Sequence, residues 1–316
     1  MLPKNWKEKV LKTKETVEKI QKGEIEFFRT GFSAIDEILY GSVLPGAQFV
    51  VAGATGMGKT MVMINMALQL AKMGKRVRYF SLENSIHSII VRMISNLSGV
   101  YVARIRRGNL NEKEIEALEN AYQMLSQLDL DVYDDVFSPH EICKKIKEEK
   151  PDVFFIDYVQ NLYLNDYTVS RNRTQEVGRI SRMMRETAVA NNAISVLGSQ
   201  LSRKVDDRED KRPRNSDLRD SGELEQDADV IMLLYRDEYY YGEKSEKQGI
   251  LEIAISKNRE GATGYAEFIW RPETSRIEEV WMGEEYEADG IDYDEESIEE
   301  FEPQVSLDDL KDIVNF

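Results

Sequence analysis

The chain has 316 residues, of which 41% are hydrophobic, and this is enough to build one sizeable core. Its polar start, and the lack of any apolar run of about eighteen residues, argue against a secretion signal and a membrane span. A single cysteine, Cys143, excludes an internal disulfide, so we expect a cytoplasmic protein.

The formal net charge of −16 is concentrated near the end of the chain. Residues 278–316 hold sixteen acidic residues and one base, Lys311, whereas the remaining 277 residues hold 42 acids and 41 bases. The body of the protein is therefore almost neutral, and a neutral body can still carry a basic channel. The overall charge does not exclude nucleic acid as a partner.

Residues 1–27 are predicted to form an amphipathic helix that ends at Gly23. A free helix of this length would be only marginally stable, so its apolar face needs a partner, either in its own domain or on a neighbouring subunit. That face carries Trp6, Val10, Val17 and Ile20.

Residues 28–280 alternate strand-like and helix-like segments, which predicts an α/β domain with a mainly parallel sheet. Buried parallel strands are apolar on both faces, and this pattern occurs at residues 49–52, 77–81, 153–157, 194–198 and 230–234. Antiparallel strands are expected to end the sheet at residues 250–256, 265–270 and 276–280. Gly261 and Gly264 are expected to supply turns between them.

Residues 281–316 are predicted to be an acidic, largely disordered tail with a short helix at its end. Ser306 would cap that helix, and Leu307, Leu310 and Val314 would form its apolar face. The tail either keeps the protein in solution, or it screens a DNA channel or recruits another protein through the apolar face.

The octapeptide at residues 53–60 has the pattern Gly-x-x-x-x-Gly-Lys-[Ser/Thr] of a phosphate loop, and it stands between a strand-like and a helix-like run. Backbone N–H groups and the positive end of the following helix would surround the phosphates of ATP. Lys59 would reach the β- and γ-phosphates, and Thr60 would bind Mg²⁺. The loop consists of Gly53, Ala54, Thr55, Gly56, Met57, Gly58, Lys59 and Thr60.

Three polar residues follow or end predicted strands, where they could meet the phosphates. Asp157 would orient the Mg²⁺ shell, and Glu83 could take a proton from the attacking water. Gln200 could donate a hydrogen bond to a γ-phosphate oxygen. Taken alone, Glu83 is more typical of a helix start, and a Ser-Gln pair after a strand is common.

His87, His140 and Cys143 are interpreted as structural residues. The two histidines have no Cys or His neighbours at the spacing of a metal site, so no zinc is expected. Cys143 lies in a helix-like stretch beside Ile142 and Ile146, which is typical of a core or boundary thiol rather than a nucleophile.

The order of these motifs, together with longer segments, resembles the C-terminal motor domain of the DnaB family of replicative DNA helicases. The resemblance covers residues 28–272, and its most specific parts are residues 217–229 and the block around Lys257 and Arg259. The matching segments are residues 30–36, 53–60, 80–83, 156–160, 170–173, 198–203, 211–229, 234–240 and 256–264.

This resemblance implies a RecA-like P-loop NTPase core and a role for each site residue. Glu83 would be the catalytic glutamate, Asp157 the metal-orienting aspartate and Gln200 the γ-phosphate sensor. Lys257 and Arg259 would form a basic pair that reaches the nucleotide of a neighbouring subunit. A basic residue supplied in this way can raise the rate of hydrolysis by about 10³–10⁵-fold. Without the resemblance, this pair would be interpreted as solvated hairpin charges.

The resemblance also implies that residues 201–222 contact single-stranded DNA. Arg219, Asp220 and Gly222 match a loop that grips the phosphates of one strand, which gives binding independent of sequence. Mixed charges of this kind are otherwise typical of a polar surface loop. The other basic candidates in the segment are Arg203, Lys204 and Arg212.

As a whole, the resemblance implies an ATP-dependent homohexameric helicase that moves 5′ to 3′ on single-stranded DNA and unwinds duplex at a replication fork. Residues 1–27 would correspond to the family's linker helix, and the N-terminal collar domain, with primase coupling through it, is not expected. A helicase loader, a primase or another replication protein could bind the acidic tail. Two alternatives stay open: a RecA-like recombinase or recombination mediator, and a nucleotide-gated DNA-binding scaffold.

Overall fold

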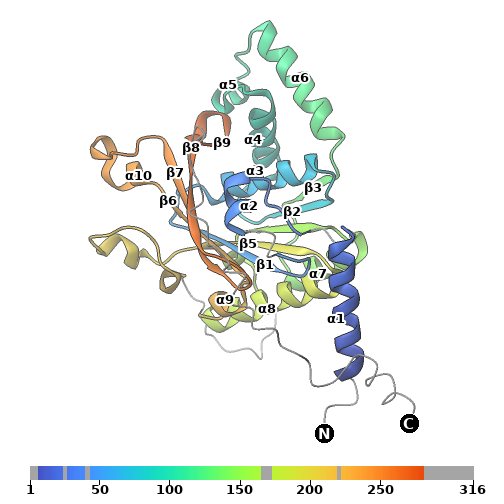
Figure 1. Cartoon of the computed structure of the whole chain (residues 1–316). Coiled ribbons are helices and arrows are strands. Elements are labelled where there is room, and N and C mark those ends of the chain that lie inside the picture. The colour runs from blue at the N-terminus through green and yellow to red at the C-terminus, as the bar shows by residue number, and fades with distance from the viewer. Residues whose placement is uncertain (1–5, 24–26, 40–42, 165–172, 219–221, 281–316) are drawn as a thin grey trace, which may run out of the picture. The chain divides into compact units, whose positions relative to one another are not determined.

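The computed structural model describes residues 6–23, 27–39, 43–164, 173–218 and 222–280 (Figure 1). The chain divides into two units, Met1–Val280 and Trp281–Phe316. The second unit lies outside the described residues, and the predicted acidic tail and its terminal helix lie there with it.

Within the described residues, one nine-stranded sheet has the order β3-β2-β4-β5-β1-β6-β7-β8-β9. The strands from β3 to β6 in this order are parallel, and β7, β8 and β9 are antiparallel additions, as the sequence predicts. The parallel strands are β1 (Gln48–Gly53), β2 (Val77–Ser81), β3 (Leu130–Tyr133), β4 (Val153–Asp157), β5 (Ile194–Gln200) and β6 (Val230–Tyr235). The antiparallel strands are β7 (Ile250–Asn258), β8 (Gly264–Arg271) and β9 (Arg276–Glu279).

Two details of the sheet differ from the sequence prediction. Strand β3 was not predicted, because it is a short edge strand without the continuous apolar run of its neighbours. Gly264 was expected in a turn, but it begins β8 and pairs with Ile255. A Cβ atom at Gly264 would lie 3.3 Å from the Ile38 side chain. The lack of a side chain at Gly264 therefore permits close packing of helix α2 (Ser33–Leu39) on this strand.

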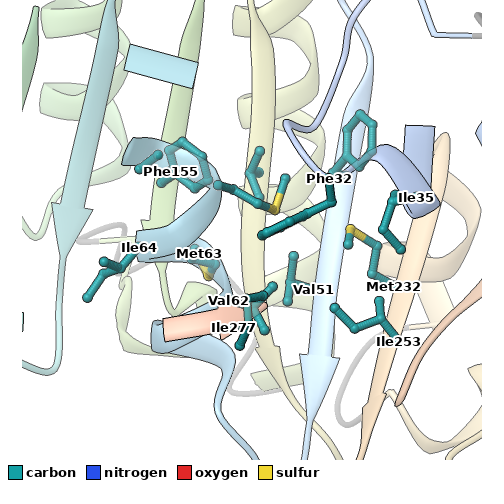
Figure 2. Close-up of a cluster of buried hydrophobic side chains, with 14 of the residues drawn as sticks. Phe32, Ile35, Val51, Val62, Met63, Ile64, Phe155, Met232, Ile253 and Ile277 are labelled. Carbon is teal, nitrogen blue, oxygen red and sulfur yellow. The ribbon is translucent and has the colours of Figure 1, made fainter. Parts of the chain in front are cut away.

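Helices cover both faces of the parallel strands, which explains why these strands are apolar throughout (Figure 1). One face packs against α2, α3 (Lys59–Lys72) and α4 (Ile86–Ser98). Figure 2 shows Phe32, Ile35, Val51, Met63 and Phe155 among the side chains of this core. The other face packs against α7 (Pro139–Glu149), α8 (Arg173–Asn191) and α9 (Gly222–Asp227).

The remaining helices lie outside these two layers. Helices α5 (Val102–Arg107) and α6 (Glu112–Ser126) form a smaller apolar cluster with the end of α4. Asn111 and Glu114 cap the start of α6 reciprocally. Helix α10 (Asp237–Tyr241) lies in the β6–β7 connection. None of the helices in the described part of the chain is long and apolar enough to cross a membrane.

Helix α1 (Trp6–Gln21) is followed by a turn in which Gly23 has a φ of +69°, as expected for a glycine that ends a helix. Trp6, Val10 and Val17 each keep 48% of their surface exposed. Three of the four residues of the predicted apolar face are thus exposed on the surface of this chain, and Ile20 is partly exposed.

Candidate active site

The carboxyl ends of the parallel strands bring the phosphate loop, Glu83, Asp157 and Gln200 to one edge of the sheet. The register pairs Gly53 with Gln200 and Ser81 with Asp157, so β1, β5, β2 and β4 end close together. Polar residues at these ends line one cavity of about 280 Å³. Its walls include Thr55, Lys59, Thr60, Glu83 and Gln200.

The phosphate loop joins β1 to α3, and two of its glycines are required by their backbone. Gly56 has a φ of +76° and Gly58 a φ of +111°, in the left-handed region that favours glycine. A Cβ atom at Gly58 would also lie only 2.3 Å from the Trp270 ring. Helix α3 begins directly after Gly58, so its N-terminal N–H groups and its dipole favour an anion at the loop.

The ammonium group of Lys59 lies inside this loop. Its Nζ donates hydrogen bonds to the carbonyl oxygens of Gly53 at 2.9 Å and Ala54 at 3.1 Å. Burial lowers the pKa of Lys59, whereas the nearby charges of Asp157 and Glu83 raise it. The ammonium group thus lies near two carboxylates, of which Glu83 lines the cavity and Asp157 is buried.

Asp157 ends β4 and is almost fully buried, with 1% of its surface exposed. Burial raises the pKa of its carboxyl group, and hydrogen bonds from Thr60 and Tyr79 lower it. Oδ1 of Asp157 is buried and has no hydrogen-bond partner among the described residues. A carboxylate oxygen beside a threonine hydroxyl suits the water shell and oxygen ligands of Mg²⁺, so Thr60 and Asp157 fit this metal.

Glu83 and Gln200 complete the polar lining of the cavity. Glu83 lies two residues beyond the end of β2 and is exposed to solvent. Nε2 of Gln200 donates a hydrogen bond of 2.6 Å to Oγ1 of Thr55, which places this amide on the phosphate loop. Carboxylate, amide and ammonium groups thus surround one space in which a triphosphate and a water molecule could react.

Several cavity residues were not predicted from the sequence. Arg92 of α4 lines the cavity, and its Nε is buried without a hydrogen-bond partner among the described residues. The sequence did hold a signal, because Arg92 is the only Lys, Arg, Asp or Glu in the helix that follows Glu83. Trp270 and Ser275 reach the cavity from β8 and the turn after it, and only the tertiary structure brings them there.

Lys257 and Arg259 do not join this cavity. The neighbouring Asn258 pairs with Val230 at the start of β6, which in turn lies beside the start of β1. The pair therefore lies at the opposite edge of the sheet from the phosphate loop, roughly 15 Å away along the strands.

Both basic side chains form hydrogen bonds with backbone carbonyl oxygens at the end of α9. Nζ of Lys257 donates to the Glu225 carbonyl oxygen at 2.5 Å, and Nη2 of Arg259 donates to that of Gln226 at 2.8 Å. Arg259 also forms an ion pair with Asp229 at 3.3 Å. Burial lowers the pKa of Lys257, and the nearby charge of Arg259 lowers it further.

The predicted DNA segment is only partly described. Arg219 and Asp220 lie outside the described residues, as do the side chains of Arg203 and Lys204. Gly222 is the exposed first residue of α9.

Arg212, the remaining basic candidate of that segment, has partners within the chain. Its guanidinium donates two hydrogen bonds to Glu252, at 3.0 and 2.9 Å, and lies 4.7 Å from the centre of the Tyr235 ring. These contacts anchor the segment to β6 and β7, a role that was not predicted.

Cys143 is half-buried and accepts a hydrogen bond from the Thr187 hydroxyl, with Oγ1 and Sγ 3.1 Å apart. Burial raises the pKa of its thiol, which disfavours the reactive thiolate. This environment agrees with the structural role predicted for Cys143.

Comparison with known proteins gives one consistent result. The family model described as "DnaB-like helicase C terminal domain" matches residues 28–279. The chain is 40% identical over 240 residues to a "Probable plasmid replicative DNA helicase" of Chlamydia psittaci, covering 74% of this chain and 51% of that protein. It is 34% identical over 268 residues to "Replicative DNA helicase DnaC" of Bacillus subtilis, covering 82% and 58%. The chain thus spans about half the length of these relatives, or slightly more.

Solved structures give the same result. A structure titled "The Structure Of A DnaB-Like Replicative Helicase And Its Interactions With Primase" has a TM-score of 0.77 and 30% identity. It covers 84% of this chain and 65% of the other. A second solved structure, described as an ATPase domain, has a TM-score of 0.78 and 29% identity, covering 86% of this chain and 98% of that one. The predicted fold is confirmed by these similarities.

Proposed function

The chain belongs to the DnaB-like helicase C-terminal domain family, and we propose that it is the ATP-hydrolysing motor of a homohexameric replicative DNA helicase. The observation that carries this proposal is the division of the site between two edges of one sheet. Lys59, Asp157 and Gln200 lie at one edge, whereas Lys257 and Arg259 lie at the other. Such a site becomes complete when each copy offers its basic pair to the next copy around a ring.

Each residue of the cavity would act on a different part of the reaction. Lys59 would exchange its bonds to loop carbonyls for bonds to the β- and γ-phosphates, and Gln200 would donate to a γ-phosphate oxygen. Glu83 would accept a proton from the attacking water. The Thr60 hydroxyl group and the Asp157 carboxylate would hold Mg²⁺, which would neutralise phosphate charge when bound.

The pair Lys257 and Arg259 would act on the nucleotide of the adjacent subunit. In the single chain, their hydrogen bonds go to carbonyl oxygens and to Asp229, which are ordinary surface interactions. In the ring they would leave these partners and bond γ-phosphate oxygens as negative charge develops there. This would link hydrolysis to contact between subunits.

Residues 201–222 are the proposed contact with single-stranded DNA, through its phosphates. The logarithm of the binding constant should then fall with the logarithm of salt concentration, with a slope of about −0.7 for each phosphate neutralised. Fluorescence anisotropy of labelled oligonucleotides measures this slope. Arg219→Ala should make the slope less steep by about 0.7. It should also weaken DNA binding by the same factor for every base sequence. A slope that does not change would remove Arg219 from the contact.

Arg212→Ala is the matched comparison for that experiment. Its guanidinium is already bonded to Glu252, so we expect a loss of stability and an unchanged salt slope. A slope that changed in this variant would assign DNA contact to Arg212 as well.

Strand displacement on a forked duplex tests the proposed activity as a whole. We expect ATP-dependent unwinding of a fork with a free 5′ single-stranded tail and little unwinding of one with only a 3′ tail. A recombinase or recombination mediator would instead pair strands, and a nucleotide-gated scaffold would bind DNA without DNA-stimulated release of phosphate. The Lys59→Ala variant serves as the inactive control.

A helicase loader, a primase or another replication protein, acting in the cytoplasm, is a further proposed partner of the ring. We propose the acidic residues 281–316 as a contact for one of them, because a peptide with this charge can bind a basic surface. Deleting these residues should leave ATP turnover intact and impair loading.

A further inference from the structure

Tyr79 is a buried polar residue that belongs to no motif of the sequence. It is fully buried in β2, with 0% of its surface exposed. Its hydroxyl group nevertheless donates a hydrogen bond of 2.8 Å to Oδ2 of Asp157 on the adjacent strand. The register pairs Tyr79 with Phe155 and Ser81 with Asp157. Because residues two apart on a strand share a face, Tyr79 can reach along that face to the carboxylate.

The position of this hydroxyl group is fixed by packing. The Tyr79 ring is stacked on that of Phe155, with ring centres 5.6 Å apart and an angle of 19° between the planes. A tyrosine hydroxyl group carries its proton at neutral pH and a carboxylate only accepts, so Tyr79 is the donor in this hydrogen bond.

The two oxygens of Asp157 have different surroundings. Oδ2 accepts the hydrogen bond from Tyr79. Oδ1 is buried and lacks a hydrogen-bond partner in the part of the chain that the structure describes. A buried carboxylate oxygen of this kind is normally satisfied by a ligand or by water. The Asp157 carboxyl group as a whole interacts with the hydroxyl group of Thr60, which would bind the metal.

We propose that Tyr79 is a positioning residue for Mg²⁺, because its hydroxyl group holds Oδ2 of Asp157 and would leave Oδ1 available to the metal and its water shell. The inference rests on the proposed ATP-hydrolysing function. Because Tyr79 is fully buried, it would touch neither the nucleotide nor the metal. It acts through Asp157, so it should change the affinity for Mg²⁺ and leave turnover at saturating Mg²⁺ nearly unchanged.

Tyr79→Phe tests this role, because it removes one oxygen and keeps the stacked ring. Binding of a fluorescent ATP analogue and turnover of ATP are each measured across a Mg²⁺ titration. We expect the Mg²⁺ concentration at half-saturation to rise about tenfold in both measurements, the lower end of what losing the partner of a metal ligand causes. Turnover at saturating Mg²⁺ should return to within about twofold of the wild type.

Tyr133→Phe is the matched control. The Tyr133 hydroxyl group donates to the Glu149 carboxylate at 2.8 Å, on the edge strand β3 of the same sheet. This variant loses the same kind of hydrogen bond outside the cavity, and its Mg²⁺ dependence should equal that of the wild type. Tyr79→Leu also lacks the hydroxyl group but packs differently. If circular dichroism shows that both variants are folded, Tyr79→Leu should show the same rise in the Mg²⁺ concentration at half-saturation as Tyr79→Phe.

The outcomes are distinguishable. An unchanged Mg²⁺ half-saturation in Tyr79→Phe, while the wild type responds to Mg²⁺, would overturn the role of Tyr79 alone. Loss of nucleotide binding at every Mg²⁺ concentration would also overturn it, because the hydroxyl group would then only support the fold. If binding and turnover by the wild type were independent of Mg²⁺, the proposed function itself would fail.

Discussion

Arg259→Ala should lower DNA-stimulated ATP turnover by about 10³–10⁵-fold and leave nucleotide binding nearly unchanged. Arg259 lies at the sheet edge opposite to the phosphate loop of its own chain, so it does not contact the nucleotide bound there. We propose that it bonds the neighbour's γ-phosphate mainly as charge develops during hydrolysis. An interaction made only in the transition state affects turnover without affecting binding. Turnover is measured with saturating DNA, and binding with a non-hydrolysable ATP analogue.

Arg76→Ala is the matched control for this variant. Arg76 precedes β2 at the same edge of the sheet and is paired with Asp152 at 2.9 Å, so its loss removes a similar surface ion pair. The Arg259 variant should stay folded, because Asp229 keeps its ion pair with Arg185 at 2.9 Å. Normal turnover in Arg259→Ala would contradict its role in the neighbour's site. Equal losses in both variants would indicate damage to the fold.

Glu83→Gln should lower ATP turnover by about 10²–10⁴-fold, the usual contribution of a general base. Glutamine keeps the size of the side chain, but it cannot accept the proton of the attacking water at neutral pH. ATP binding should be retained or improved, because one negative charge beside the phosphates is removed. Single-turnover measurements with radiolabelled ATP separate the chemical step from binding.

Glu273→Gln is the comparison for the Glu83 variant. Glu273 lies between Pro272 and Ser275, two residues that line the same cavity, so the substitution removes an equal charge nearby. Its turnover should stay close to that of the wild type. If Glu83→Gln hydrolysed ATP at the wild-type rate, another group would have to be the base, and Glu83 would be a helix-start residue.

The sequence was sufficient for the parts of the site that depend on local structure. The phosphate loop is continuous in the chain, and its glycines at positions 56 and 58 have the backbone angles that the motif requires. Asp157 and Gln200 could be assigned because parallel strands bring their carboxyl ends to one edge of the sheet. The alternation of strands and helices also predicted most of the sheet, including its antiparallel end.

The remaining site residues depend on packing between distant segments. Trp270 lies near Gly58 because β8 is part of the same sheet, and no local sequence pattern marks Trp270 as part of a cavity. The hydroxyl group of Tyr79 reaches Asp157 across a strand pair whose register a sequence does not reveal. Arg212 could not be distinguished from a DNA contact, because its partner Glu252 is forty positions away. The roles of such residues can be assigned only from the three-dimensional structure and not from sequence motifs.

In the proposed ring, each site for ATP is shared by two copies of the chain, and dilution tests this sharing most directly. ATP turnover per chain is measured over a wide range of protein concentrations with single-stranded DNA, while the mass of the particles is determined in the same samples. Turnover should fall together with the fraction of assembled rings, because a separated chain lacks the basic pair of its neighbour. Full turnover per chain in samples that contain only monomers would contradict the shared site.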